Sequence, residues 1–256
     1  MKADMITDVP GRTGGTPLAS ATTTATIPAT TPATTPAATS ASAATAPVAD
    51  LVEAWAVGWA LSRHRPRPAE HPWGRYIDVG APHEVGRHVL PYADGAAVGR
   101  ATASVTVPRT WLKAPMPSED LARWLPADWV VDLEDAGHLM TTDLRPTHPL
   151  PPADYVTSVE ARDGVAFVEV HDAQGELAAQ GQVALLGRSA VVDCVITQEA
   201  HRRRGLGSLV MRTLADRAVA EGARLGILGA TDEGRALYET LGWQVRAPLA
   251  ACTYLP

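Results

Sequence analysis

The sequence predicts a mixed α/β fold in which helices flank a central, mostly antiparallel sheet. The first observation is a series of segments rich in β-branched and apolar residues, separated by turn residues, which is typical of an antiparallel meander; they are 155–161, 165–171 and 176–186. The second is the apolar strand pattern of 190–196, which leads through a glycine-containing loop into apolar residues at helical spacing. We therefore expect this strand to extend the meander and to carry the loop.

The composition is that of a globular protein. The chain has 256 residues, 46% of them hydrophobic, which suits one large or two small domains. The net charge of −6 argues against a nucleic-acid-binding protein, which is usually basic. Two cysteines, Cys194 and Cys252, cannot form the disulfide framework of a secreted protein. No apolar run has membrane-spanning length and no signal sequence is evident, so we expect a cytoplasmic protein without a membrane partner.

We divide the chain into three parts. Residues 1–48 are dominated by Ala, Thr and Pro, and we expect them to be disordered, because such a tract buries too little apolar area to offset the entropy of ordering. This part could be a tether or an interaction arm, or have no role. Residues 49–146 are expected to form a helix and a first α/β half, and residues 147–256 a second half.

The first half opens with a predicted helix. Asp50 and Glu53 resemble a capping box, and Trp55 and Trp59 share one helical face. We expect both tryptophans to be core residues. The segments predicted after this helix are a proline-rich linker at 65–72, strands at 75–79, 87–90, 110–114 and 129–133, and helices at 93–104 and 118–125.

The second half repeats this order of elements. Its predicted segments are a linker at 147–152, the meander, strand 190–196, a long helix ended by Gly222, strand 225–228, helix 232–241, and strands 244–246 and 251–255. In addition, 121–129 and 235–243 each read as a short helix that ends at a tryptophan. We therefore predict that 75–140 is a degenerate copy of the second half without a glycine-containing loop; the alternative is chance similarity.

The loop after strand 190–196 has the composition of an anion site. Arg202, Arg203 and Arg204 supply positive charge, and two glycines at 205 and 207 let a phosphate approach the backbone. The first amides of the following helix lack intrahelical partners, and the helix dipole is partly positive there. This predicts a site for a pyrophosphate or a similar anion, the alternative being a solvated loop.

The spacing of the loop residues indicates which class of phosphate-containing ligand the loop binds. Position 210 is valine where the dinucleotide-binding pattern needs glycine, and the P-loop sequence Gly-Lys-Ser/Thr is absent. The order Arg202-x-x-Gly205-x-Gly207 resembles the acetyl-CoA pyrophosphate loop of the GNAT acetyltransferase superfamily. A second block, 231–243, resembles a later segment of the same family, and its matching residues are Leu237, Tyr238, Gly242 and Trp243.

Two positions of the second block depart from the family pattern. Thr231 stands where the family usually has asparagine, and Gly234 stands where it usually has alanine. The first departure affects the residue that usually contacts the pantetheine arm. Over 190–243 the resemblance implies the GNAT fold, and the first half would then be GNAT-like and degenerate.

The resemblance also implies acetyl-CoA as co-substrate. The backbone amides of 203–208 would bind its pyrophosphate, and the main chain of 195–197 would pair with the pantetheine amides. The residues assigned to acetyl-CoA in this way are Val195, Ile196, Thr197, Arg202, Arg203, Arg204, Gly205, Leu206, Gly207, Ser208 and Thr231. Tyr238 corresponds to the family tyrosine that protonates the leaving thiolate, and its alternative role is packing on the sheet.

A base must remove a proton from an ammonium acceptor before it can attack. Asp193 is our candidate, because strand alternation places it on the same face as Val191 and Val195. Glu169 and Glu160 on neighbouring strands are the alternatives. The eight histidines are scattered without ligand spacing, so we predict no metal.

The function implied by the resemblance is direct transfer of acetyl from acetyl-CoA to a primary amine of a small molecule or peptide in a ternary complex. A non-catalytic acyl-CoA-binding or sensing module is the alternative. Thr231 favours this alternative, whereas Tyr238 favours the enzyme. A third possibility is a scaffold that uses the proline-rich arm and binds no CoA. The sequence is compatible with more than one oligomeric state.

Overall fold

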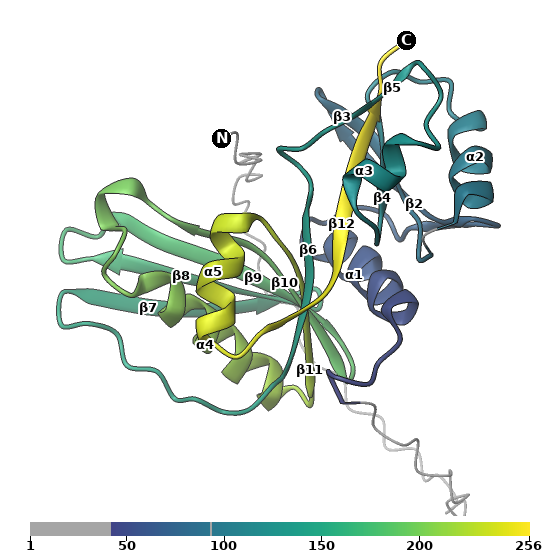
Figure 1. Cartoon of the computed structure of the whole chain (residues 1–256). Helices are drawn as coiled ribbons and strands as arrows, with labels where there is room; N and C mark the ends of the chain where they lie inside the picture. Colours follow the sequence, from purple (N-terminus) through teal and green to yellow (C-terminus); the bar gives the residue numbers. More distant parts are fainter. Residues whose placement is uncertain (1–41, 93) are drawn as a thin grey trace, which may run out of the picture. The chain divides into compact units, whose positions relative to one another are not determined.

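The structure is a computed structural model that describes residues 42–92 and 94–256 (Figure 1). Its strands, in chain order, are β1 (Ala69–His71), β2 (Gly74–Ala81), β3 (Glu84–Val89), β4 (Thr110–Ala114), β5 (Trp129–Val131), β6 (Gly137–Asp143), β7 (Tyr155–Arg162), β8 (Val165–Asp172), β9 (Leu177–Leu186), β10 (Ser189–Thr197), β11 (Leu225–Ala230) and β12 (Gln244–Tyr254). The helices are α1 (Val48–Ser62), α2 (Gly95–Ala103), α3 (Ser118–Ala122), α4 (Leu206–Ala220) and α5 (Asp232–Thr240), with a 3₁₀ turn at Glu199–His201.

These strands form a mixed sheet in the order β1-β2-β3-β4-β12-β6-β11-β10-β9-β8-β7, and β5 also pairs with β12. The pairs β3–β4 and β10–β11 are parallel, and the other pairs are antiparallel. The predicted fold class, a mostly antiparallel sheet flanked by helices, is therefore confirmed.

The first and second halves exchange strands. β6, which ends the first half, pairs with β11 and with the beginning of β12. The end of β12 pairs with β4 and β5 of the first half. Figure 1 shows β12 running as one long strand from the sheet of the second half into that of the first. Each half is thus completed by a strand that the other half supplies.

Helices cover both faces of the sheet in the second half. α1 packs on β9, β10 and β11, and α4 packs on β8, β9 and β10. The alternation of β10 separates the two layers, since Val191 lies in the core under α1 and Val192 in the core under α4. Gly58 permits the close approach of α1, because a Cβ there would lie 2.3 Å from Cγ2 of Val191.

The prediction of disorder for 1–48 is wrong for residues 42–48, which form a turn and the first residue of α1, while residues 1–41 lie outside the described residues. The Ser42 hydroxyl and the Ala43 amide donate to the Asp143 carboxylate over 3.2 and 2.8 Å, and Arg246 donates to the Ala43 carbonyl. These bonds give the short turn polar partners that its own composition does not supply. The partners lie at least 100 residues away, so local sequence does not signal them.

The meander is confirmed, but other elements differ from their predictions. β1 falls in the predicted linker, and β6 has no predicted counterpart. β12 is one strand with a bulge between Val245 and Ala247, where the sequence predicts two. The predicted capping box is wrong, since α1 begins at Val48 after Pro47 and Asp50 lies in its first turn.

A buried histidine in the first half predicts a pH dependence of stability. His88 is 5% exposed, and its Nδ1 lies 3.3 Å from the indole nitrogen of Trp73, which donates to it. Burial, and secondarily the charge of His71, lowers the pKa of His88 to about 4. Tyr76 packs against the same ring. The fold therefore favours the neutral imidazole.

We expect the free energy of unfolding to fall as the pH is lowered from the unfolded pKa of about 6.5 towards the folded pKa of about 4. At 1.36 kcal/mol per pKa unit, the loss is at most roughly 3 kcal/mol. Urea denaturation at pH 7 and pH 4 measures it. His88→Gln should flatten this dependence, whereas the exposed His148→Gln control should not. An equal dependence in all three proteins would contradict the assignment.

Candidate active site

An opening between two parallel strands lies next to the predicted anion loop. β10 pairs with β11 only over Ser189–Val191 and Leu225–Ile227. Beyond these residues β11 continues to pair with β6 on its other side as far as Ala230. Within the described part of the chain, no strand pairs with the edge of 193–197 that faces β11. The two strands therefore stop pairing with each other after Val191 and Ile227.

A bulge in β10 accompanies the divergence. The register against β9 shifts between Asp193 and Ile196, and Cys194 has a φ of +52°. This conformation is unfavourable for a residue with a side chain, and it turns the strand locally. The main chain of 195–197, predicted to pair with pantetheine, comes directly after this turn. Its pairing with a ligand stays a prediction.

The loop that follows has the geometry of an anion-binding helix start. Gly205, the residue before α4, is left-handed with a φ of +80°, and no side chain among the described residues caps the helix. A Cβ at Gly205 would point into open space, whereas one at Gly207 would lie 3.0 Å from the Leu237 side chain. The amides at the start of α4 are thus not covered by a capping side chain, as an anion site requires.

The three arginines of the loop differ in their surroundings. Arg204 Nη1 donates to the Tyr155 hydroxyl over 2.9 Å, and that hydroxyl lies 3.0 Å from His201 Nδ1. Arg202 Nε lies 3.4 Å from the Thr197 carbonyl oxygen, to which it donates, and Arg203 is exposed. Arg204 is therefore held in place from β7. Tyr155 and His201 were not predicted, because the contact joins segments 46 residues apart.

Thr231 begins α5 and is occupied as its cap. Its hydroxyl accepts a bond from the Gly234 amide over 3.2 Å, which satisfies one of the first amides of the helix. The neighbouring Asp232 carboxylate lies 2.7 Å from His138 Nε2 on β6. The cap explains why threonine can replace asparagine at the start of this helix, and the contact of Thr231 with acetyl-CoA stays a prediction.

Tyr238 lies on α5 and is partly buried, with its ring 6.3 Å from that of Trp243. Burial raises the pKa of Tyr238 to about 12, and the negative charge of Asp193 acts in the same direction. The phenol is therefore protonated at neutral pH and can donate a proton. The influence of Asp193 brings the two predicted catalytic residues into one electrostatic environment.

Asp193 is held by the end of α1. Arg63 donates to both carboxylate oxygens, from Nε over 2.7 Å and from Nη2 over 3.1 Å, and the Ser62 hydroxyl donates over 2.9 Å. The side chain of Asp193 is only 14% exposed. Burial by itself would raise the pKa of Asp193, but Arg63 and Ser62 outweigh it and lower the pKa below its ordinary value. Sequence reasoning singled out Asp193 but not its partners.

The alternative bases lie farther along the sheet. Glu169 is on β8 and Glu160 on β7, two and three strands from β10 in the order of the sheet. Glu169 lies 3.7 Å from His171, and Glu160 lies 3.7 Å from Arg162. Both carboxylates are exposed. Of the three acidic candidates, Asp193 is therefore the one at the opening between β10 and β11.

Within residues 42–92 and 94–256, no helix combines the length and the apolar character needed to cross a membrane. Among the same residues, no three His, Cys, Asp or Glu side chains gather in a group that could hold a metal ion.

Part of the sequence matches a known protein family, and the fold is similar to solved structures. The Acetyltransferase (GNAT) family model matches residues 119–243. A GCN5-related N-acetyltransferase from Kribbella flavida shares the fold, with 18% identity and a TM-score of 0.55 over 81% of this chain and 95% of that chain. A putative acetyltransferase from the GNAT family of Novosphingobium aromaticivorans is 18% identical, with a TM-score of 0.49 over 73% of this chain and 89% of that chain. Residues 119–243 of this chain are therefore a GNAT-family acetyltransferase domain.

Proposed function

We propose that this protein is an acetyl-CoA-dependent N-acetyltransferase that acetylates a primary amine of a small molecule or peptide. The observation that carries the proposal is the uncapped start of α4 beside the opening between β10 and β11. The helix start suits the diphosphate, and the opening suits the pantetheine arm, which would pair its amides with the main chain of 195–197. The thioester would then lie near the bulge and Tyr238.

The proposed reaction is direct attack within a ternary complex. The neutral amine attacks the acetyl carbonyl carbon and forms a C–N bond, and the carbonyl oxygen becomes an oxyanion that needs hydrogen-bond donors. The C–S bond then breaks, sulfur keeps the electron pair, and Tyr238 gives its phenolic proton to the thiolate. The proton that the amine loses goes to a base, directly or through water.

Asp193 stays our predicted base, and its contacts suggest a second role. A carboxylate with a lowered pKa that accepts bonds from Arg63 and Ser62 is a weak proton acceptor. The same bonds fix the end of α1 to the bulge, next to the opening. We propose that this attachment holds the opening in shape, whether or not Asp193 also takes a proton.

Release of free CoA tests the proposed function against the sensing module. Purified protein, acetyl-CoA and a panel of small amines and peptides with free amino groups are incubated together, and the liberated thiol is measured. We expect thiol release that depends on one class of amine. Binding of acetyl-CoA without release under any acceptor would favour the non-catalytic module. Absence of binding would contradict both.

Replacement of the proposed acid tests the mechanism. In Tyr238→Phe we expect kcat to fall about 100-fold, within the usual range for loss of a general acid, while the Kd of acetyl-CoA changes less than about threefold. Tyr254→Phe, which changes a tyrosine packed on Trp129 in the first half, is the matched control and should keep kcat. An unchanged kcat in Tyr238→Phe would refute the assigned role.

The compartment is also a proposal. Cys194 and Cys252, both in the described part of the chain, are not joined in a disulfide. This agrees with a reducing environment. We propose that the protein acts in the cytoplasm, where acetyl-CoA is available to it.

A further inference from the structure

The connection from β3 to α2 in the first half corresponds in topology to the anion loop between β10 and α4 in the second half. The order β3–α2–β4–α3–β5 matches β10–α4–β11–α5–β12. The strands on either side of the helix are parallel neighbours in both cases. In each half, the last two strands of this series are separated by a strand from the other half. In the first half β12 lies between β4 and β5, and in the second half β6 lies between β11 and β12. The two connections are therefore topological equivalents.

The β3–α2 connection carries a negative charge at the helix start, whereas the β10–α4 loop carries positive charges. Asp94 precedes α2 and accepts a bond from the Ala96 amide over 2.9 Å, so a carboxylate occupies the place where an anion would bind. A diphosphate there would meet like charge. The first half therefore does not repeat the acetyl-CoA site that we propose for the second.

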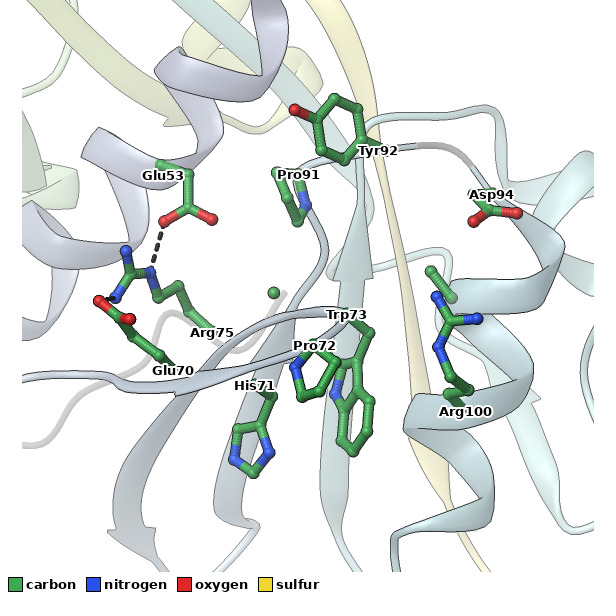
Figure 2. Close-up of a pocket in the computed structure, with 12 residues that line it drawn as sticks. Glu53, Glu70, His71, Pro72, Trp73, Arg75, Pro91, Tyr92, Asp94 and Arg100 are labelled. Atoms are coloured by element: carbon green, nitrogen blue, oxygen red, sulfur yellow. Dashed lines mark hydrogen bonds and ion pairs between the residues drawn. The ribbon is translucent and has the colours of Figure 1, made fainter.

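A cavity of about 500 Å³ lies at this connection, between α1 and α2 (Figure 2). This volume falls in the range of sites for small organic molecules. Glu53, Glu70 and Asp94 face two arginines in its lining, Arg75 and Arg100, so three carboxylates and two guanidinium groups leave a net charge of −1. The cavity thus has a slight preference for a cation.

The positive charge of Arg75 does not oppose the binding of a cation, because two carboxylates neutralise that charge. Its Nε donates to Glu53 over 2.5 Å, and its Nη1 donates to Glu70 over 2.6 Å. Each of these bonds uses one oxygen of the carboxylate. In Figure 2 the second oxygen of Glu53 lies on the side of the cavity. The group formed by Arg75, Glu53 and Glu70 carries one net negative charge, and all three residues line the cavity.

Aromatic and proline side chains form the other walls. Figure 2 shows Tyr92 and Pro91 on one side of the cavity and Trp73 and Pro72 on the opposite side. Tyr92 is 66% exposed, so much of its side chain is accessible to a ligand. Carboxylates beside aromatic faces are the combination that binds ammonium groups.

We propose that this cavity binds a small primary amine with a flat apolar body. The ammonium group would lie at Glu53 and Glu70, and the body would lie between Trp73 and Tyr92. The site is separate from the proposed diphosphate loop and does not depend on it. It assigns a ligand-binding role to the half that lacks the loop.

Calorimetric titration with three probes of one shape tests the proposal. Tryptamine carries the ammonium group, indole-3-ethanol is its neutral counterpart, and indole-3-acetate is the anion. We expect tryptamine to bind the full-length protein at least about tenfold more tightly than either of the others. Equal binding of the three probes, or no binding of tryptamine, would overturn the proposal.

Variants locate the binding. Glu53→Gln and Tyr92→Ala should each weaken tryptamine binding about tenfold or more, and the exposed Glu119→Gln on α3 is the control that should not. The double variant Gly205→Val/Gly207→Val should still bind tryptamine, so failure of the acetyl-CoA site is distinguishable from failure of this one. If neither Glu53→Gln nor Tyr92→Ala changes the affinity for tryptamine, tryptamine binds at another site and the assignment is refuted.

Discussion

Substitution of both loop glycines by valine, Gly205→Val/Gly207→Val, is expected to weaken acetyl-CoA binding at least about 100-fold, which corresponds to about 2.7 kcal/mol. Gly205 is left-handed, with a φ of +80°, and its missing Cβ faces open space where a ligand can approach. A side chain there would stand between the diphosphate and the first amides of α4. Isothermal titration of the variant with acetyl-CoA measures the loss.

A glycine at the other end of α4 gives a matched control. Gly222 is also left-handed, with a φ of +94°, and a Cβ there would likewise meet open space. Valine at either position imposes similar backbone strain, about 1–2 kcal/mol. Gly222→Val should therefore lose stability as Gly205→Val does but keep its affinity for acetyl-CoA. Equal loss of affinity in both variants would mean that strain, not access to the helix start, is responsible.

Removal of either partner of the Arg63–Asp193 ion pair is expected to lower the free energy of unfolding by about 3 kcal/mol or more, because it leaves the other charge largely buried. The side chains are 22% and 14% exposed. Arg63 also stacks over the ring of Trp59, 4.5 Å from its centroid, so its loss affects packing in addition. Urea denaturation of Arg63→Leu, Asp193→Asn and the double variant measures the effect.

The double variant shows whether the two side chains act together. Since the residues are in direct contact, its loss of stability should be clearly smaller than the sum of the single losses. Additive losses would contradict the importance of the pair.

Kinetics of the same variants separate the two proposed roles of Asp193. If Asp193 holds the opening in shape, Arg63→Leu and Asp193→Asn should both raise the KM for acetyl-CoA, by similar factors. If Asp193 is the base, only Asp193→Asn should lower kcat strongly and remove the acidic limb of the pH–rate profile. Wild-type rates for Asp193→Asn at every pH would exclude it as the base.

Local patterns in the sequence predict the part of the site that is local in the chain. The strand, the loop and the helix start are consecutive, and Gly205 and Arg204 lie within them. The meander was predictable for the same reason, because its turns join neighbouring strands. The resemblance of the second block likewise rests on one short helix, which the structure places at Asp232–Thr240.

Contacts between distant segments were not predictable from such patterns. Arg63 and Asp193 are 130 residues apart, and Ala43 and Arg246 are 203 apart. The exchange of β6 and β12 between the halves is also invisible to periodicity, since a strand pattern indicates which face is buried but not which strand is the neighbour. The environment of Asp193, and hence its lowered pKa, could be established only from the structure.

Titration of the wild-type protein with acetyl-CoA and with acetyl-pantetheine, which lacks the diphosphate and the nucleotide, tests the central claim most directly. We expect acetyl-CoA to bind with measurable heat and acetyl-pantetheine to bind at least about 100-fold more weakly, because the start of α4 would hold the diphosphate. No heat with acetyl-CoA, or equal affinity for the two compounds, would contradict the account.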